Sequence, residues 1–151
     1  MVEIIAYEDK HQPQFRRLNL EWLEKYNLLE THDVEVLDDP RKTVLDDGGF
    51  IYLASFNDEV IGTAALAKME EGTYELVKMS VAPEHRGKGV GNTLIQHCLD
   101  EARRLKASKV LLYSNSQLQA AINMYEKFGF KHIPVVDSPF VTADIKMELS
   151  L

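Results

Sequence analysis

Apolar residues in the first third of the chain recur with the spacing of one strand and two helices. Residues 2–6 are expected to form an edge strand. The apolar positions of the first helix recur at intervals of three and four: Phe15, Leu18, Trp22 and Tyr26. Pro13 suits the first turn of this helix. A second, shorter helix is expected within residues 33–45, with an interruption at Pro40.

The middle of the chain has the pattern of three successive strands. Residues 49–56 and 59–68 are separated by Asn57 and Asp58, a pair that favours a tight turn. Residues 70–72 then turn the chain into a third strand, residues 74–81. The pattern therefore predicts an antiparallel meander.

The last part of the chain alternates between helical and strand patterns. The expected elements, in chain order, are a helix at 92–106, a strand at 109–113, a helix at 117–128, and strands at 130–135 and 143–149. Gly129 is of the type preferred just past a helix end, and residues 136–142 form the loop between the last two strands. The expected class is α/β, with a mixed sheet of the α+β kind.

Length and composition narrow the class of protein. The chain has 151 residues, 45% of them hydrophobic and 27% charged, which suits one globular domain over residues 1–151. No apolar run is long enough to span a membrane, and the first residues lack the pattern of a signal peptide. The single cysteine, Cys98, fits a reducing compartment and is expected to pack in the core. We therefore expect a cytoplasmic protein without a membrane partner.

The net charge of −7 argues against a nucleic-acid partner, because no basic stripe is present to displace counterions. The five histidines are scattered without ligand spacing, so no metal site is expected. A homodimer is compatible with the sequence, which does not determine the oligomeric state.

A glycine-rich segment follows the third meander strand and precedes a helix. It contains Gly87, Gly89 and Gly91, with positive charge from Arg86 and Lys88. Free N–H groups and the positive end of the helix dipole would converge there, so a phosphate or pyrophosphate is the expected ligand. The alternative is an ordinary surface turn with a solvated arginine and lysine.

The spacing of these glycines fits neither a Walker loop nor the dinucleotide fingerprint. Arg-Gly-x-Gly-x-Gly after a strand instead resembles the acetyl-CoA-binding motif of the GNAT superfamily of N-acetyltransferases. Residues 123–130, Asn-Met-Tyr-Glu-Lys-Phe-Gly-Phe, resemble the second signature of that family. The two signatures stand in the family's order and together cover residues 74 to about 133, whereas the N-terminal half matches only in its pattern of elements.

The resemblance implies a GNAT-like fold, in which the meander is followed by a β-α-β-α-β half and two central parallel strands splay apart to admit acetyl-CoA. Here those strands are residues 74–81 and 109–113. Related sequences often place an asparagine seven residues before the signature tyrosine, where this chain has Leu118. The residues expected to contact the cosubstrate are Met79, Ser80, Val81, Arg86, Gly87, Lys88, Gly89, Val90, Gly91 and Asn92. Because Leu118 departs from the family pattern, Asn115 and Asn123 are the remaining polar candidates for this contact. Asn115 has an alternative role as a helix cap.

Glu75 is the candidate general base. Strand alternation is expected to place it on the same face as Val77, Met79 and Val81, where apolar neighbours would raise the pKa of its carboxyl group. Many GNAT enzymes carry a glutamate on this strand. The alternatives are a solvated Glu75, a Glu75 paired with Lys78, or a chain of water molecules that replaces it as the base.

Tyr125 is the candidate general acid. The family places a tyrosine at this point of its second signature, with the hydroxyl beside the CoA sulfur, and a phenol can donate a proton while its ring packs on apolar surface. The alternative is a core aromatic on a helical stripe. A backbone N–H near Met79 is the candidate for holding the oxyanion.

The acceptor is expected to be a primary amine of a small molecule or protein. The family's acceptor pocket involves the first helices and the loop between the last two strands, which correspond here to Trp22, Tyr26, Glu30, His32, Asp33 and Phe140. Two other classes stay open at this point. One is a CoA-binding module without turnover, and the other is an unrelated nucleotide-binding α/β domain, which would lack the meander.

Overall fold

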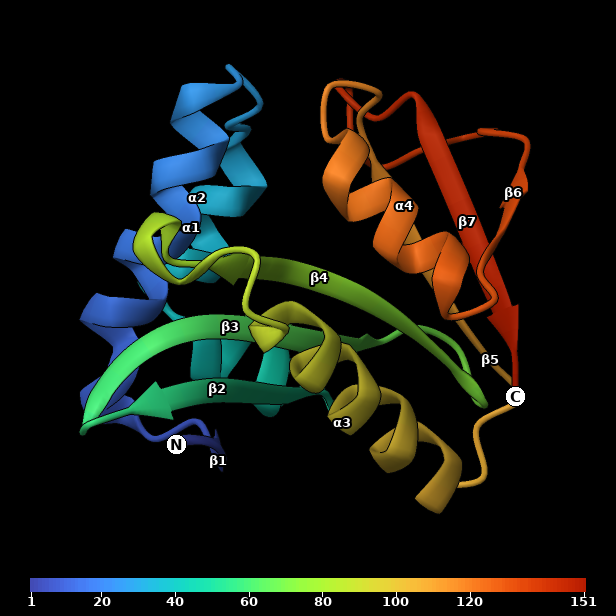
Figure 1. Cartoon of the computed structure of the whole chain (residues 1–151). Helices are drawn as coiled ribbons and strands as arrows, with labels where there is room; N and C mark the ends of the chain where they lie inside the picture. Colours follow the sequence, from blue (N-terminus) through green and yellow to red (C-terminus); the bar gives the residue numbers. More distant parts are fainter.

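The computed structural model describes residues 1–151 as a seven-stranded sheet with helices on both faces (Figure 1). The strands are β1 (Val2–Ala6), β2 (Phe50–Phe56), β3 (Glu59–Lys68), β4 (Thr73–Val81), β5 (Lys109–Ser114), β6 (Lys131–Ile133) and β7 (Ile145–Ser150). The helices are α1 (Gln12–Lys25), α2 (Thr31–Asp38), α3 (Val90–Arg104) and α4 (Gln119–Lys127). The strand order across the sheet is β1-β2-β3-β4-β5-β7-β6.

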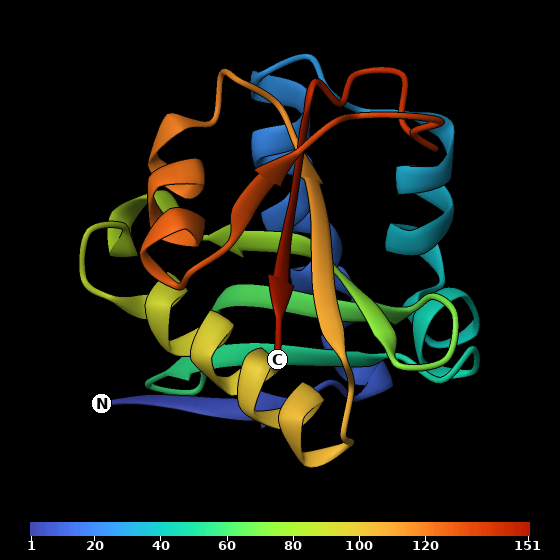
Figure 2. The same ribbon diagram turned by 90° about the vertical axis from the view of Figure 1, so that its right-hand side faces the viewer.

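The predicted antiparallel meander is confirmed, and β1 extends it at the edge (Figure 2). Asn57 and Asp58 both adopt positive φ, at 51° and 62°. Two such residues form the hairpin turn whose twist matches that of the flanking strands, and Asn and Asp tolerate this conformation better than most side chains.

Several helix and strand ends differ from those expected. α2 begins at Thr31, because Glu30 and Asp33 form a capping box, and a π-helical turn, Arg41–Leu45, follows Pro40. α3 begins at Val90, because Gly89 leaves the helical conformation with φ of 81°. Three further elements are shorter or shifted: α4 is Gln119–Lys127 where 117–128 was expected, β6 is Lys131–Ile133 where 130–135 was expected, and β7 is Ile145–Ser150 where 143–149 was expected.

The two central parallel strands separate, as expected. β4 and β5 pair only at their beginnings, from Thr73 with Lys109 to Glu75 with Leu111. Beyond that point β5 pairs along its length with β7, while β4 stays paired with β3. The edge of β4 from Val77 to Val81 therefore has no strand partner on its β5 side.

A β-bulge in β4 changes which side chains share a face. Ala65 of β3 lies opposite Val77, but Thr63 lies opposite Ser80, so β4 carries one extra residue between these pairs. Lys78 absorbs the extra residue with φ of 52°. Ala65 and Thr63 are two residues apart in β3 and therefore point to the same face of the sheet. Their partners Val77 and Ser80 consequently lie on that face as well.

The core lies on both faces of the meander. Ser80 donates a hydrogen bond to the Leu18 carbonyl of α1 (2.9 Å), and on the other face α3 packs close to Gly62. Cys98 of α3 is fully buried in this core, as expected. None of the helices combines the length and the apolar character needed to cross a lipid bilayer.

Candidate active site

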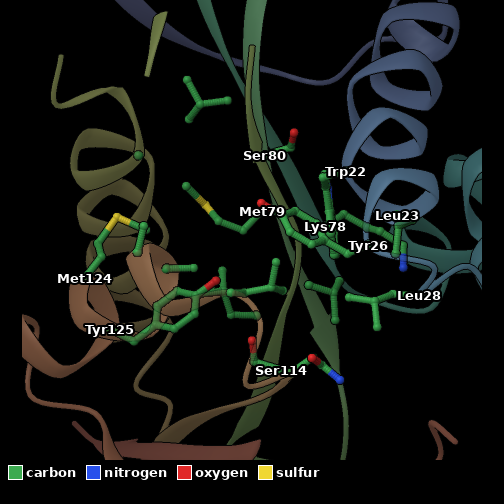
Figure 3. Close-up of a pocket in the computed structure, with 18 of the residues that line it drawn as sticks. Trp22, Leu23, Tyr26, Leu28, Lys78, Met79, Ser80, Ser114, Met124 and Tyr125 are labelled. Carbon is green, nitrogen blue, oxygen red and sulfur yellow. The ribbon is translucent and has the colours of Figure 1, made fainter. Parts of the chain in front are cut away.

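A cavity of about 680 Å³ opens where β4 and β5 separate. In Figure 3, Trp22, Tyr26 and Leu28 approach it from one direction, while Met124 and Tyr125 approach it from the other. We call the wall formed by residues 85–92 and α4 the loop side. We call the wall formed by α1, α2 and residues 140–143 the helix side.

The glycine-rich loop forms part of the loop side. Gly87 and Gly89 adopt φ of 77° and 81°, a region that strains other residues, and a Cβ at either position would meet no atom within 4 Å. The first intrahelical bond of α3 runs from the Thr93 N–H to the Gly89 carbonyl (3.1 Å). The N–H groups of residues 90–92 precede that bond, so they remain available to an anion.

Gly91 differs from the other two glycines of the loop because it lies in a crowded position. A Cβ on Gly91 would lie 3.1 Å from Met124 Sδ and 3.2 Å from Met79 Cε. Gly91 therefore allows α3 to pack closely against α4 and β4.

The two basic residues of the loop differ in their contacts. Arg86 donates from Nε to the Val81 carbonyl (3.0 Å) and pairs through Nη2 with Glu21 of α1 (3.1 Å). Arg86 therefore ties the loop to α1. Lys88 is exposed and does not line the cavity, whereas the other cosubstrate residues that we expected, from Met79 to Asn123, all do.

Glu75 lines the cavity and is 5% exposed. Burial raises the pKa of its carboxyl group to about 7, and the charges of Lys78 and Lys146 partly offset that rise. The expected grouping with Met79 and Val81 is wrong, because the bulge reverses the alternation at Lys78. Glu75 shares a face with Val77 and Ser80 and therefore lies toward the helix side.

Tyr125 of α4 is 7% exposed, and its ring packs edge-on against Phe130 with centroids 5.9 Å apart. Its side chain points from α4 into the cavity (Figure 3). Burial raises the pKa of the phenol, so the hydroxyl keeps its proton at neutral pH. The ring belongs to the core and the hydroxyl faces the cavity. Tyr125 is therefore a core aromatic residue whose hydroxyl is also available as the candidate general acid.

The two asparagines lie at the cavity with different surroundings. Asn115 donates from Nδ2 to the Thr142 carbonyl (2.8 Å) and accepts from the Gln117 N–H (3.0 Å). It therefore holds the turn before α4 and the last loop, which is close to its alternative role as a cap. Asn123 is exposed on α4 at the rim.

A buried ion pair on the helix side was not predicted. Lys78 Nζ contacts Asp33 Oδ1 of α2, and both side chains are less than a tenth exposed. Pairing with Asp33 excludes the expected alternative in which Lys78 pairs with Glu75. In a regular strand, Lys78 would point to the face opposite Glu75, away from Asp33. The sequence could therefore have predicted this pair only if it had also predicted the bulge at Lys78.

A buried hydrogen-bond chain links this wall to the bulge. Trp22 Nε1 donates to Asn19 (3.1 Å), Asn19 Nδ2 donates to Thr63 (3.1 Å), and Thr63 Oγ1 donates to the Lys78 carbonyl (2.7 Å). Asn19 and Thr63 are fully buried. The chain fixes both the Trp22 ring and the main chain beside Met79.

The last loop closes the helix side. The Glu30 carboxylate accepts from the Val141 N–H (3.0 Å), the Thr142 N–H (3.1 Å) and the Thr142 hydroxyl (2.6 Å). Phe140 packs between His32 and Tyr113, with centroid distances of 4.5 Å and 5.4 Å. All the residues that we expected around an acceptor therefore gather here, although His32 supports Phe140 and does not line the cavity.

Residues 13–130 match the model of the acetyltransferase (GNAT) family. This match covers more than half of the chain. The protein belongs to the GNAT acetyltransferase family. It is therefore an N-acetyltransferase by family, and the predicted GNAT-like fold is confirmed. The alternative of an unrelated nucleotide-binding domain is excluded by this match and by the observed meander.

Individual relatives agree with the family assignment. The uncharacterized N-acetyltransferase YvbK of Bacillus subtilis is 29% identical over 114 residues, covering 74% of this chain and 73% of YvbK. N-acetylaspartate synthetase of Xenopus tropicalis is 34% identical over 95 residues. That match covers 62% of this chain but only 35% of the synthetase, so the chain matches about a third of that relative.

Solved GNAT structures share the fold. A GNAT-family acetyltransferase from Staphylococcus aureus superposes with a TM-score of 0.90 at 19% identity, covering 99% of both chains. The PaiA N-acetyltransferase of Thermoplasma acidophilum, solved in complex with coenzyme A, superposes with a TM-score of 0.78 at 17% identity, covering 100% of this chain and 99% of PaiA.

Proposed function

We propose that this GNAT protein transfers an acetyl group from acetyl-CoA directly to a primary amine of a small molecule or protein. The observation that carries the proposal is the joint placement of three features on one cavity. The glycine-rich loop, the buried Glu75 carboxyl group and the Tyr125 hydroxyl all border the gap between β4 and β5.

The loop side fits the charged and extended parts of acetyl-CoA. The two positive-φ glycines leave open space, and the first amides of α3 are free to contact a pyrophosphate. The unpaired edge of β4 at Met79–Val81 can pair with an amide-containing arm as an added strand would. When bound, acetyl-CoA supplies an activated acetyl thioester and a thiolate leaving group.

Glu75 is positioned to take a proton from the amine. Its carboxyl group, with a pKa of about 7, is a base near neutral pH and lies on the face that bears α1 and α2. The neighbouring positive charges of Lys78 and Lys146 favour its ionised form. Ordered water between Glu75 and the amine would serve the same purpose.

Tyr125 is positioned to donate a proton or a hydrogen bond to the departing thiolate. Its hydroxyl is protonated at neutral pH and faces the cavity from α4, next to the glycine-rich loop. The N–H of Met79, beside the bulge, is the proposed donor for the negative charge that develops on the acyl oxygen.

The proposal is tested by two measurements on the wild-type protein. Calorimetry should show binding of acetyl-CoA, and a thiol-detecting assay should show release of CoA that depends on an added amine. Binding without amine-dependent release across a broad amine panel would contradict transfer and support a CoA-binding module. ATP or NAD binding more tightly than CoA would contradict the assignment of the donor.

A further inference from the structure

The charged side chains that line the helix side are almost all engaged within the protein. Asp33 and Lys78 neutralise each other in their buried ion pair. Burial acts to raise the pKa of Glu30, but hydrogen bonds from Thr142 and Val141 outweigh it, so the pKa is lowered and the carboxylate is held by the last loop. Glu75 is left as the carboxylate of this wall that has neither an ion-pair partner nor a hydrogen-bond donor from the protein.

This arrangement offers little to a second charged group on the acceptor. A second ammonium group would need a free carboxylate, but Glu75 is already needed by the reacting amine. A carboxylate would need a cation in this wall, but Lys78 is already occupied by Asp33. Lys146 lies over the Tyr113 ring and does not line the cavity. An unpaired charge placed against this half-buried wall loses part of its hydration without gaining a partner, and this weakens binding.

The rest of this wall is apolar and aromatic. Trp22, Leu23, Tyr26 and Leu28 line it from α1 and the segment that follows (Figure 3), and Phe140 closes it from the last loop. Two of the aromatic rings already carry a cation of the protein, because Lys25 lies over Tyr26 (5.5 Å) and Lys146 lies over Tyr113 (5.2 Å).

We infer that the acceptor is a monoamine with an apolar body, neither a polyamine nor an amino acid. This inference rests on the proposed acetyl transfer and narrows its substrate class. The single amino group meets Glu75 at the splay, and the apolar body packs against Trp22, Tyr26 and Phe140. Selectivity then arises mainly from rejection of a second charge.

Two matched pairs of amines test this inference at one pH above the pKa of Glu75. Hexylamine and cadaverine have the same length and differ by a terminal methyl or ammonium group. Phenethylamine and phenylalanine differ by a carboxylate. We expect kcat/KM to be at least about tenfold higher for the monoamine of each pair. A cadaverine or phenylalanine value equal to or above that of its partner would overturn the inference.

The same experiment separates this inference from the proposed function. Activity with the doubly charged members alone would leave acetyl transfer intact and contradict the substrate class. Binding of acetyl-CoA with no turnover of these four amines or of the broad amine panel would contradict acetyl transfer, and the substrate class with it.

A charge added to the wall provides a second test. Phe140→Glu places a carboxylate where the apolar body is expected and should raise the cadaverine-to-hexylamine ratio of kcat/KM by roughly tenfold. Val141→Glu is the matched control, because Val141 is the next residue, is 94% exposed and does not line the cavity. A ratio that moves equally in both variants, or in neither, would contradict the placement of the acceptor.

Discussion

The loop side and the helix side border one cavity but are built in different ways. The anion-binding part of the loop side is a single stretch of chain, from the end of β4 into the first turn of α3. The helix side is assembled from distant segments. Glu30 holds Thr142 across 112 residues, and Asp33 holds Lys78 across 45. A local stretch leaves a motif in the sequence, whereas a long-range assembly does not.

The two sides should respond differently to amino-acid substitutions. A substitution at Gly87 or Gly89 on the loop side should weaken binding and leave the fold largely intact, because a Cβ at either position would meet no other atom of the protein within 4 Å. Removing a buried group from the helix side should destabilise the fold, because its partner would be left uncompensated.

The largest effect is expected for Asp33→Ala. It leaves the buried Lys78 ammonium without its partner, and the free energy of unfolding should fall by about 3–5 kcal/mol. Urea denaturation measures the loss. Asp38→Ala is the control on the same helix, because its exposed pair with Arg16 should contribute less than about 1 kcal/mol. The double variant Asp33→Ala with Lys78→Met should recover much of the lost stability. If Asp33→Ala lowers the free energy of unfolding no more than Asp38→Ala does, the contrast between the two sides is contradicted.

Glu75→Gln should stabilise the protein at alkaline pH. The pKa of Glu75 is raised by burial from 4.5 to about 7, so its ionisation in the folded state is unfavourable. The stability contributed by the protonated form is fully present below pH 4.5 and is lost as the pH rises through 7. At pH 8 the variant should therefore be more stable by up to about 3 kcal/mol. Urea denaturation across this range should show the difference vanishing toward pH 4.5, and a pH-independent difference would contradict the buried carboxylate.

Tyr125→Phe should separate catalysis from binding on the loop side. The ring and its packing on Phe130 remain, but the proton donor is lost, so kcat should fall roughly 10- to 1000-fold with little change in acetyl-CoA affinity. Steady-state kinetics and calorimetry measure the two effects. Tyr52→Phe is the control, since Tyr52 is also a buried tyrosine but packs on His97 outside the cavity. Unchanged kcat for Tyr125→Phe would assign the residue to the core alone.

Gly89→Glu should give the smallest effect and the one most confined to binding. The added side chain and charge occupy the space above the free amides of α3, so the dissociation constant of acetyl-CoA should rise at least tenfold, about 1.4 kcal/mol. Gly48→Glu controls for backbone strain, because Gly48 has φ of 94° and lies outside the cavity. A folded Gly89→Glu protein with unchanged affinity would remove the loop from the binding site.

The sequence predicted the elements whose signals are local. The hairpin at Asn57 and Asp58, the meander and the position of the glycine-rich loop agree with the expectation. The separation of β4 from β5 agrees with what the family resemblance implied. The error in the face of Glu75 came from the bulge at Lys78, which depends on pairing with β3. The Asp33–Lys78 pair and the chain from Trp22 through Asn19 to Thr63 were missed for the same reason, because each joins segments that only the tertiary fold brings together.

The most direct test of acetyl transfer at this cavity is the pH dependence of kcat/KM in the wild type and in Glu75→Gln. Because the base must be deprotonated, the wild-type value should fall as the pH drops below about 7, and the variant should lose this acid limb along with most of its activity. Two amines of different basicity distinguish this limb from ionisation of the substrate. A limb that persists unchanged in Glu75→Gln with both amines, at full activity, would contradict the role of Glu75 as the base.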